Sequence, residues 1–213
     1  MADIFHEIEE DLRRDQAAAL WKKYANLIIG AALVVVLAVA GQWGWKEYTA
    51  RRQLQASADF LSAAATGDLA KREAALSKVA ADGGSYAVLA RFRLAETAIQ
   101  GGDKAKARNI LGEIANDQSA DKALRDLATI QAALLELQIG KPETAAGMVK
   151  DLTKEGEAYR LSAIEITGLA ALAGGDKEKA KATFGELKKA AEAEAPGSGF
   201  VERADQLLDR LAD

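Results

Sequence analysis

The chain has 213 residues, with 28 Lys and Arg against 32 Asp and Glu, one His, no Cys and a net charge of −4. The lack of Cys excludes a disulfide framework and thiolate chemistry, and the single His6 provides neither a histidine metal site nor a nucleophile–base pair for a hydrolase. Basic patches interleaved with aromatic residues, typical of nucleic-acid binding, are also missing. We therefore expect a protein that is not an enzyme, uses no cofactor or metal, and binds neither nucleic acid nor a small-molecule substrate.

Residues 1–23 form a polar N-terminal tail with a helical pattern. Ile4, Ile8 and Leu12 recur at i, i+4 and i+8 with Phe5 beside them, and acidic residues come early. This spacing predicts an amphipathic helix. Two interpretations stay open: the helix lies on a membrane surface or in solvent, or it is a docking site for a cytoplasmic partner.

Residues 24–45, "YANLIIGAALVVVLAVAGQWGW", form an apolar segment without a formal charge. A helix of about 20 residues spans roughly 30 Å, the thickness of the hydrocarbon core of a bilayer. Its apolar residues lie all the way round the helix, which leaves no face for water. Aromatic residues flank both ends, as at membrane–water interfaces: Trp21, Tyr24, Trp43, Trp45 and Tyr48. The segment predicts a single transmembrane helix.

Two other interpretations of this segment are a cleaved export signal and the buried helix of a soluble core. Ala38 and Ala40 have the small-residue spacing of a cleavage site, but the preceding tail is long and acidic rather than short and basic. Basic residues near the membrane set the orientation of a span, and slightly more of them precede the segment than follow it. They are Arg13, Arg14, Lys22 and Lys23 before it, and Lys46, Arg51 and Arg52 after it. We expect a cytoplasmic N-terminus and an exported C-terminal domain.

Residues 46–195 repeat a pattern of helix, Gly turn and helix. Gly67, Gly102, Gly140 and Gly175 occupy successive turns, 35, 38 and 35 residues apart. Glycine ends a helix because it adopts the left-handed cap without a steric cost. A repeat of about 34 residues with two helices is typical of tetratricopeptide repeats. Two Pro and abundant Ala, Leu, Glu and Lys agree with an all-α fold.

The residues around each turn support this interpretation. Asp68, Asp103 and Asp176 can cap the helix that follows the turn, and Pro142 suits the first turn of a helix. The motif then requires small and bulky apolar residues in fixed order. These are Ala107, Ala145 and Ala180; Leu111, Val149 and Phe184; Ile114, Leu152 and Leu187; and, in the preceding helix, Ala95, Ala133 and Gly168. The unit at Gly67 fits less well, with Arg72 in the small-residue position before Leu76 and Val79.

Residues 196–213 are predicted to form a capping helix that closes the apolar end of the last repeat. A Pro-Gly-Ser-Gly break precedes it. Its apolar residues share one side: Phe200, Ala204, Leu207, Leu208 and Leu211.

A protein-binding groove is expected along the first helices of the repeats, which line the concave face of such stacks. The register from the Gly turns directs seven residues toward it: Leu89, Phe92, Arg93, Glu96, Gln131, Leu134 and Glu165. The apolar members have an alternative role in the core between repeats, and the polar ones can simply be solvated.

This order of parts resembles the YfgM-like family of bacterial inner-membrane proteins. Members are ancillary subunits of the Sec translocon with a tetratricopeptide-like periplasmic domain. The resemblance implies a single-pass inner-membrane protein that meets a membrane-anchored periplasmic chaperone or prolyl isomerase and assists newly exported chains. Two alternatives stay open: a scaffold of another cell-envelope complex, and an envelope regulator whose N-terminal helix sequesters a cytoplasmic partner.

Overall fold

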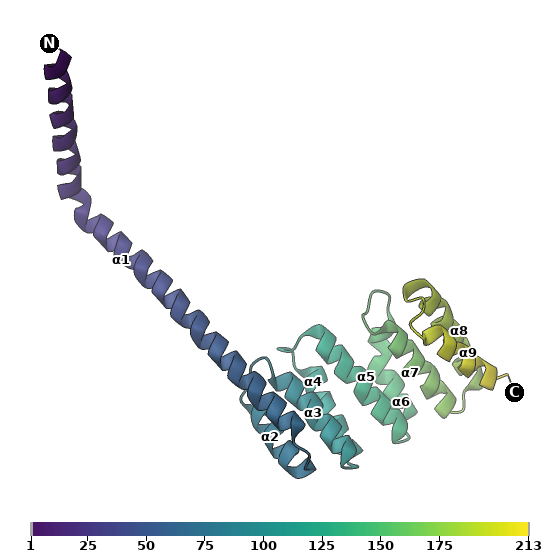
Figure 1. Ribbon diagram of the computed structural model, residues 1–213. Coiled ribbons are helices and arrows are strands. Elements are labelled where there is room, and N and C mark those ends of the chain that lie inside the picture. The colour runs from purple at the N-terminus through teal and green to yellow at the C-terminus, as the bar shows by residue number, and fades with distance from the viewer. Residues whose placement is uncertain (1, 213) are drawn as a thin grey trace. The chain divides into compact units, whose positions relative to one another are not determined.

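The computed structural model describes residues 2–212, and every regular element in that range is a helix (Figure 1). Side chains are described for residues 14, 18, 21–27, 29–31 and 33–212. The elements are α1 (Ala2–Ala65), α2 (Leu69–Ala81), α3 (Ala87–Gln100), α4 (Lys104–Asn116), α5 (Lys122–Gln138), α6 (Pro142–Val149), the 3-10 helix η1 (Lys150–Thr153), α7 (Arg160–Ala173), α8 (Lys177–Glu194) and α9 (Phe200–Arg210). The all-α prediction is confirmed.

The chain divides into two compact units, Met1–Gln55 and Ala56–Asp213. The first unit consists of α1 up to Gln55, and the last turns of α1 belong to the second unit. Helix α1 runs without a break through the predicted boundaries at 23/24 and 45/46. These boundaries are therefore changes of composition within one helix, and they stay predictions. The amphipathic pattern of Ile4, Phe5, Ile8 and Leu12 falls on side chains outside the described residues.

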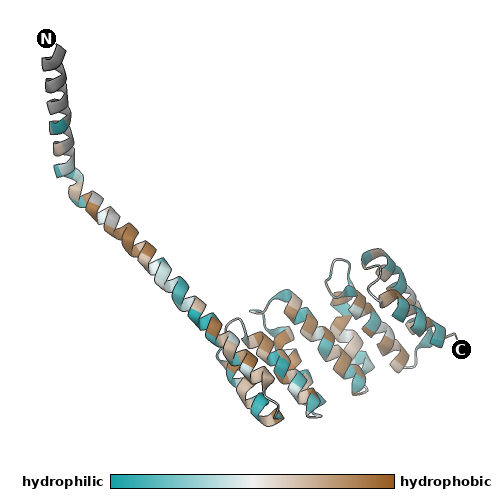
Figure 2. Cartoon of the chain, viewed as in Figure 1, coloured by the Kyte–Doolittle hydropathy of each residue, from teal (hydrophilic) through white to brown (hydrophobic). Residues whose placement is uncertain are grey.

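Apart from Ala25, which is partly buried, the described side chains of the apolar segment are exposed. Figure 2 shows this segment as a hydrophobic stretch of α1. Leu27, Val34 and Leu37 are 70%, 66% and 66% exposed. None of the apolar window is buried inside the structure, so the interpretation as a soluble core helix is wrong. By length and composition this helix can cross a membrane, and a signal sequence passes the same test.

The second unit is a stack of antiparallel helices in which consecutive elements pack side by side (Figure 1). The last turns of α1, then α3, α5 and α7, are the first helices of the repeats. The second helices are α2, α4, α6 with η1, and α8. The end of α1 packs on α2 through the core cluster that contains Ala63, Leu76 and Val79. Helices α3, α5 and α7 each contact the second helix of their own repeat and the second helix of the preceding repeat. This is the layout predicted by the spacing of the turns.

In three repeats the first helix ends at a glycine in the left-handed conformation. Gly102, Gly140 and Gly175 have φ of 84°, 79° and 85°. The residue after each glycine donates its N–H back five positions, for example from Asp103 to the Ala98 carbonyl at 2.8 Å, which closes a Schellman motif. Gly67 does not have a positive φ, so the prediction of a left-handed cap there is wrong. The chain leaves α1 through an ordinary turn, in which Thr66 N–H bonds the Ala63 carbonyl.

The predicted helix caps are confirmed. The carboxylates of Asp68, Asp103 and Asp176 accept hydrogen bonds from the N–H groups of the residues three positions later, at 2.8, 2.9 and 2.9 Å. Each bond satisfies one of the free donors at a helix N-terminus. Pro142 is the first residue of α6, where its missing N–H costs nothing.

The core follows the repeat motif. The small residues Ala107, Ala145 and Ala180 are fully buried, and the bulky positions of the same units are buried too. Gly168 shows why the motif needs a small residue in the first helix. A Cβ on Gly168 would lie 2.7 Å from Cδ1 of Phe184, and closer still to Cε1. The aromatic ring therefore packs directly on the α7 backbone.

The atypical first repeat, formed by the end of α1 and by α2, keeps its core because Arg72 points outward. Its guanidinium donates to the Thr66 carbonyl at 2.7 Å and to the Gln100 side chain at 2.8 Å. Leu76 and Val79 then fill the core with Ala63 of α1. An arginine thus occupies the position of the small residue without entering the interface.

Helix α9 covers the last repeat. Phe200, Val201, Leu207, Leu208 and Leu211 pack on the core cluster built around Phe184, with Ala204 fully buried. Lys188 on α8 bonds Asp205 on α9 at 2.7 Å, which raises the pKa of Lys188. Within the predicted range 196–213, the helix itself spans Phe200–Arg210.

Candidate functional site

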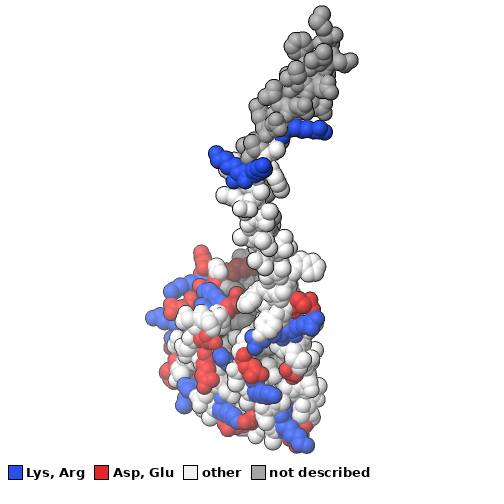
Figure 3. Space-filling view, turned by 90° about the vertical axis from the view of Figure 1, so that its left-hand side faces the viewer, with Lys and Arg blue, Asp and Glu red and all other residues white. Residues whose placement is uncertain are grey.

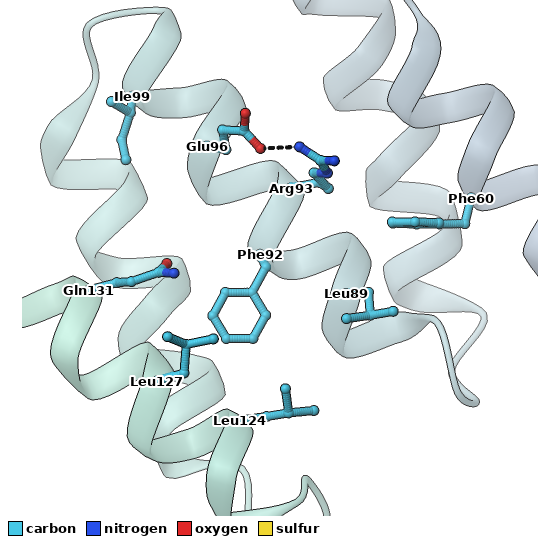
Figure 4. A pocket seen from close by; sticks show the side chains of 9 residues that line it. All are labelled: Phe60, Leu89, Phe92, Arg93, Glu96, Ile99, Leu124, Leu127 and Gln131. Carbon is cyan, nitrogen blue, oxygen red and sulfur yellow. Dashed lines mark hydrogen bonds and ion pairs between the residues drawn. The ribbon is translucent and has the colours of Figure 1, made fainter. Parts of the chain in front are cut away.

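Three neighbouring first helices form a hollow of about 510 Å³ in the second unit (Figure 4). We call it the groove pocket. It is lined from α1 by Phe60, from α3 by Leu89, Phe92, Arg93, Glu96 and Ile99, and from α5 by Leu124, Leu127 and Gln131. The volume is within the usual range for a ligand pocket.

Some apolar side chains of the pocket pack on the core, and others are exposed to solvent. Phe92 is partly buried and packs on the core shared by α3, α4 and α5, with its ring turned toward α5 and Leu127 (Figure 4). Leu89 and Ile99 are 39% and 41% exposed. Phe60 is held by Tyr86, with ring centroids 5.5 Å apart. Phe92 therefore supports the surface, while Leu89 and Ile99 are available to a partner.

The polar part of the pocket is electrically balanced. The Arg93 guanidinium lies 2.6 Å from the Glu96 carboxylate, which also accepts a hydrogen bond from Gln100 at 3.3 Å (Figure 4). Gln131 adds an exposed neutral amide. On the face of the second unit shown in Figure 3, positive and negative side chains are likewise mixed. A partner would thus be selected by apolar contact rather than by net charge.

The structure brings five of the seven predicted groove residues into this pocket: Leu89, Phe92, Arg93, Glu96 and Gln131. Leu134 lies nearly one turn beyond Gln131 on α5, 40% exposed, but does not line the pocket. Glu165 accepts two hydrogen bonds from Arg203 of α9, at 2.8 and 3.3 Å. Its carboxylate is therefore committed to the terminal helix rather than to the groove.

Four lining residues were missed by the sequence reasoning: Phe60, Ile99, Leu124 and Leu127. Leu124 and Leu127 precede Gln131 by seven and four positions, so helical periodicity carried a signal for them. Phe60 had none, because its place beside α3 depends on how the end of α1 packs in the tertiary structure.

Ion pairs of one kind position the first helices. In each of three repeats, a basic residue near the start of the first helix (α3, α5 or α7) binds an acidic residue. This acidic residue lies at or after the end of the second helix of the same repeat. The pairs are Arg91–Asp117 at 2.8 Å, Lys122–Glu157 and Arg160–Glu194. Hydrogen bonds from Ser119 and then Arg91 lower the pKa of Asp117 to about 2. The hydrogen bonds that Lys122 donates, first to Asp126 and then to Glu157, raise the pKa of Lys122.

A buried carboxylate joins the second repeat (α3 and α4) to the third repeat (α5 and α6). Glu136 of α5 is fully buried, and its Oε1 accepts a bond from Nε of Arg108 on α4 at 2.5 Å. Its Oε2 is the one buried side-chain polar atom of the described residues without a hydrogen-bond partner. In the part of the chain that the structure describes, no group of three His, Asp or Glu side chains is placed to hold a metal ion.

Comparison with known proteins identifies the fold family. The tetratricopeptide repeat-like domain matches residues 19–209, a range that includes the apolar segment as well as the repeats and α9. No curated protein and no solved structure matches the chain. Repeat stacks of this kind are typically scaffolds that bind other proteins rather than catalysts. The chain belongs to the tetratricopeptide repeat-like domain family.

Proposed function

We propose that this protein is a membrane-anchored binding module of the bacterial inner membrane. In this proposal residues 24–45 span the bilayer, residues 1–23 are cytoplasmic, and the repeats of 46–195 with the terminal helix of 196–213 lie in the periplasm. Its role is that of an accessory subunit of the Sec translocon, assisting exported proteins together with a membrane-anchored periplasmic chaperone.

The groove pocket is the observation that carries this proposal. Leu89 and Ile99 are exposed beside a neutral Arg93–Glu96 pair, in a hollow that crosses three first helices. A chain emerging unfolded from a translocon exposes apolar side chains in no fixed sequence. A neutral apolar groove suits such a chain, because it gains from burial of apolar surface without demanding a matching charge.

The apolar helix supplies the second part of the proposal. Its exposed Leu and Val side chains lose contact with water on entering a bilayer. The family match includes this segment, which supports a lasting role in the protein over removal as a signal. Anchoring confines the groove to the membrane surface and raises its effective concentration toward partners at the same membrane.

A pull-down from membranes solubilised in mild detergent tests the proposed partners. We expect the full-length protein to recover translocon components and a periplasmic chaperone. The matched variants are Leu89→Gln, which alters a pocket residue that is 39% exposed, and Ile139→Gln, which alters a residue outside the pocket that is 38% exposed. Recovery should fall about tenfold for Leu89→Gln, as expected for loss of a well-packed leucine contact, and stay unchanged for Ile139→Gln.

Other outcomes of this experiment would reject the proposal. Recovery of division or cell-wall enzymes in place of the translocon would favour the envelope scaffold. Deleting residues 1–16 should leave export-side binding intact; loss of signalling in that variant would favour the regulator. Protection of the C-terminal domain from protease added to spheroplasts would overturn the orientation, and extraction of the chain by carbonate would overturn the anchor.

A further inference from the structure

The stretch that follows the apolar segment, residues 43–52 of α1, concentrates exposed aromatic and basic side chains. Trp43, Trp45 and Tyr48 are 75%, 70% and 53% exposed. In a chain anchored as proposed above, on which this inference rests, these rings lie in the headgroup layer on the side of the repeat domain. We call this stretch the juxtamembrane segment.

Ion pairing separates the charges of the juxtamembrane segment into two kinds. Arg51 and Glu47 neutralise each other, with Nε and Oε1 2.7 Å apart. Lys46 and Arg52 have no acidic partner among the described residues of the first unit. The segment therefore presents two uncompensated positive charges on a helix surrounded by aromatic rings.

The direction of the helix brings these charges toward the membrane. Side chains on a helix lean toward its N-terminus, which here is the side of the apolar segment. Arg52 does so: its guanidinium carbon lies 5.5 Å from the centre of the Tyr48 ring, one turn closer to the span. Tyr48 in turn lies beside Trp45, with ring centroids 6.3 Å apart. The row Trp45–Tyr48–Arg52 thus places a cation at the level of interfacial aromatics.

We propose that the juxtamembrane segment binds the headgroup phosphate of anionic phospholipids. A guanidinium stacked on an aromatic ring keeps its in-plane N–H donors free for two phosphate oxygens, and Lys46, about one helical turn after Trp43, adds a point charge. A zwitterionic lipid carries its own cation beside the phosphate, so two uncompensated charges favour a lipid with net negative charge. At the other end of the span, the ammonium of Lys23 lies 5.4 Å from the centre of the Tyr24 ring. The site proposed here is the one on the repeat-domain side, where a guanidinium can bind two phosphate oxygens.

Tryptophan quenching in vesicles tests this site with the full-length protein. In a Trp21→Phe background only Trp43 and Trp45 report, and both belong to the juxtamembrane segment. The probe is brominated phosphatidylglycerol, compared with brominated phosphatidylcholine at the same mole fraction. Cations near an anionic surface contribute about fivefold each in binding, so we expect at least fivefold preference for the phosphatidylglycerol.

Two double variants identify the residues. Lys46→Gln with Arg52→Gln removes the uncompensated charges and should reduce the preference to near one. Glu47→Gln with Arg51→Gln removes the neutral pair, leaves the net charge unchanged, and should retain the preference. Equal quenching by the two lipids in the parent protein, or equal loss of preference in both variants, would overturn the proposal.

Further arms separate the remaining outcomes. Inorganic phosphate at constant ionic strength should not reduce the preference; if it does, the site binds free phosphate and the lipid assignment is wrong. Flotation of the same vesicles reports anchoring independently. A chain that floats with both lipids without a preference refutes the headgroup site alone, while a chain that floats with neither refutes the membrane anchor and the headgroup site with it.

Discussion

Replacing Gly168 by Ala tests the close contact between α7 and α8. The new Cβ would lie 2.7 Å from Cδ1 and 3.0 Å from Cζ of Phe184, whose side chain is fully buried. Overpacking of this kind costs about 1–3 kcal/mol. The higher helix propensity of Ala offsets up to about 1 kcal/mol of this cost. We therefore expect the free energy of unfolding to fall by about 1–2 kcal/mol.

The assay is thermal unfolding of the full-length protein in mild detergent, followed by far-UV circular dichroism. A loss of this size lowers the Tm by about 3–6 °C for a domain of this length. Gly185→Ala is the matched control, because a Cβ there meets no atom within 4 Å and α8 should gain stability. Adding Phe184→Leu to Gly168→Ala should cost less than Phe184→Leu costs alone. A Gly168→Ala protein as stable as the parent would refute the packing argument.

Two further changes test the polar contacts of the stack. Arg108→Ala leaves the buried Glu136 carboxylate without its cation and should lower the free energy of unfolding by about 2–4 kcal/mol in urea titrations. Adding Glu136→Met should restore most of the lost stability. An unchanged urea midpoint for Arg108→Ala would show that the ion pair does not stabilise the stack. The pKa of Asp117 is lowered from 3.8 to about 2, so its contacts with Ser119 and Arg91 stabilise the fold above about pH 4 and are lost as pH falls toward 2. The Tm of the parent should therefore fall more steeply across that acid range than the Tm of Asp117→Asn, and parallel curves would show that this carboxylate does not contribute.

Much of the fold could be predicted because its signals are local. A cap such as Asp103 acts on an N–H three residues later, and Gly102 takes its conformation from its own lack of a Cβ. Helical periodicity places Ala107 and Leu111 on one buried face for the same reason. Gly67 is the exception. The spacing of the turns predicts a left-handed cap at Gly67, whereas α1 ends without that motif.

The groove pocket could be predicted only in part. Leu89, Phe92, Arg93 and Glu96 follow from the register of a single helix, α3. Phe60 does not, because its place in the pocket depends on how the end of α1 packs beside α3. Glu165 has the register of a groove residue, yet Arg203 from 38 positions later in the chain binds it.

The sequence by itself therefore determined the helices, their caps, the repeat spacing and the uncharged segment, because each depends on residues within about one or two turns of one another. Only the tertiary structure decided which exposed side chains share a surface and which charges are already paired. Those outcomes depend on distances between helices that lie dozens of residues apart in the chain, and helical periodicity within one element does not contain them.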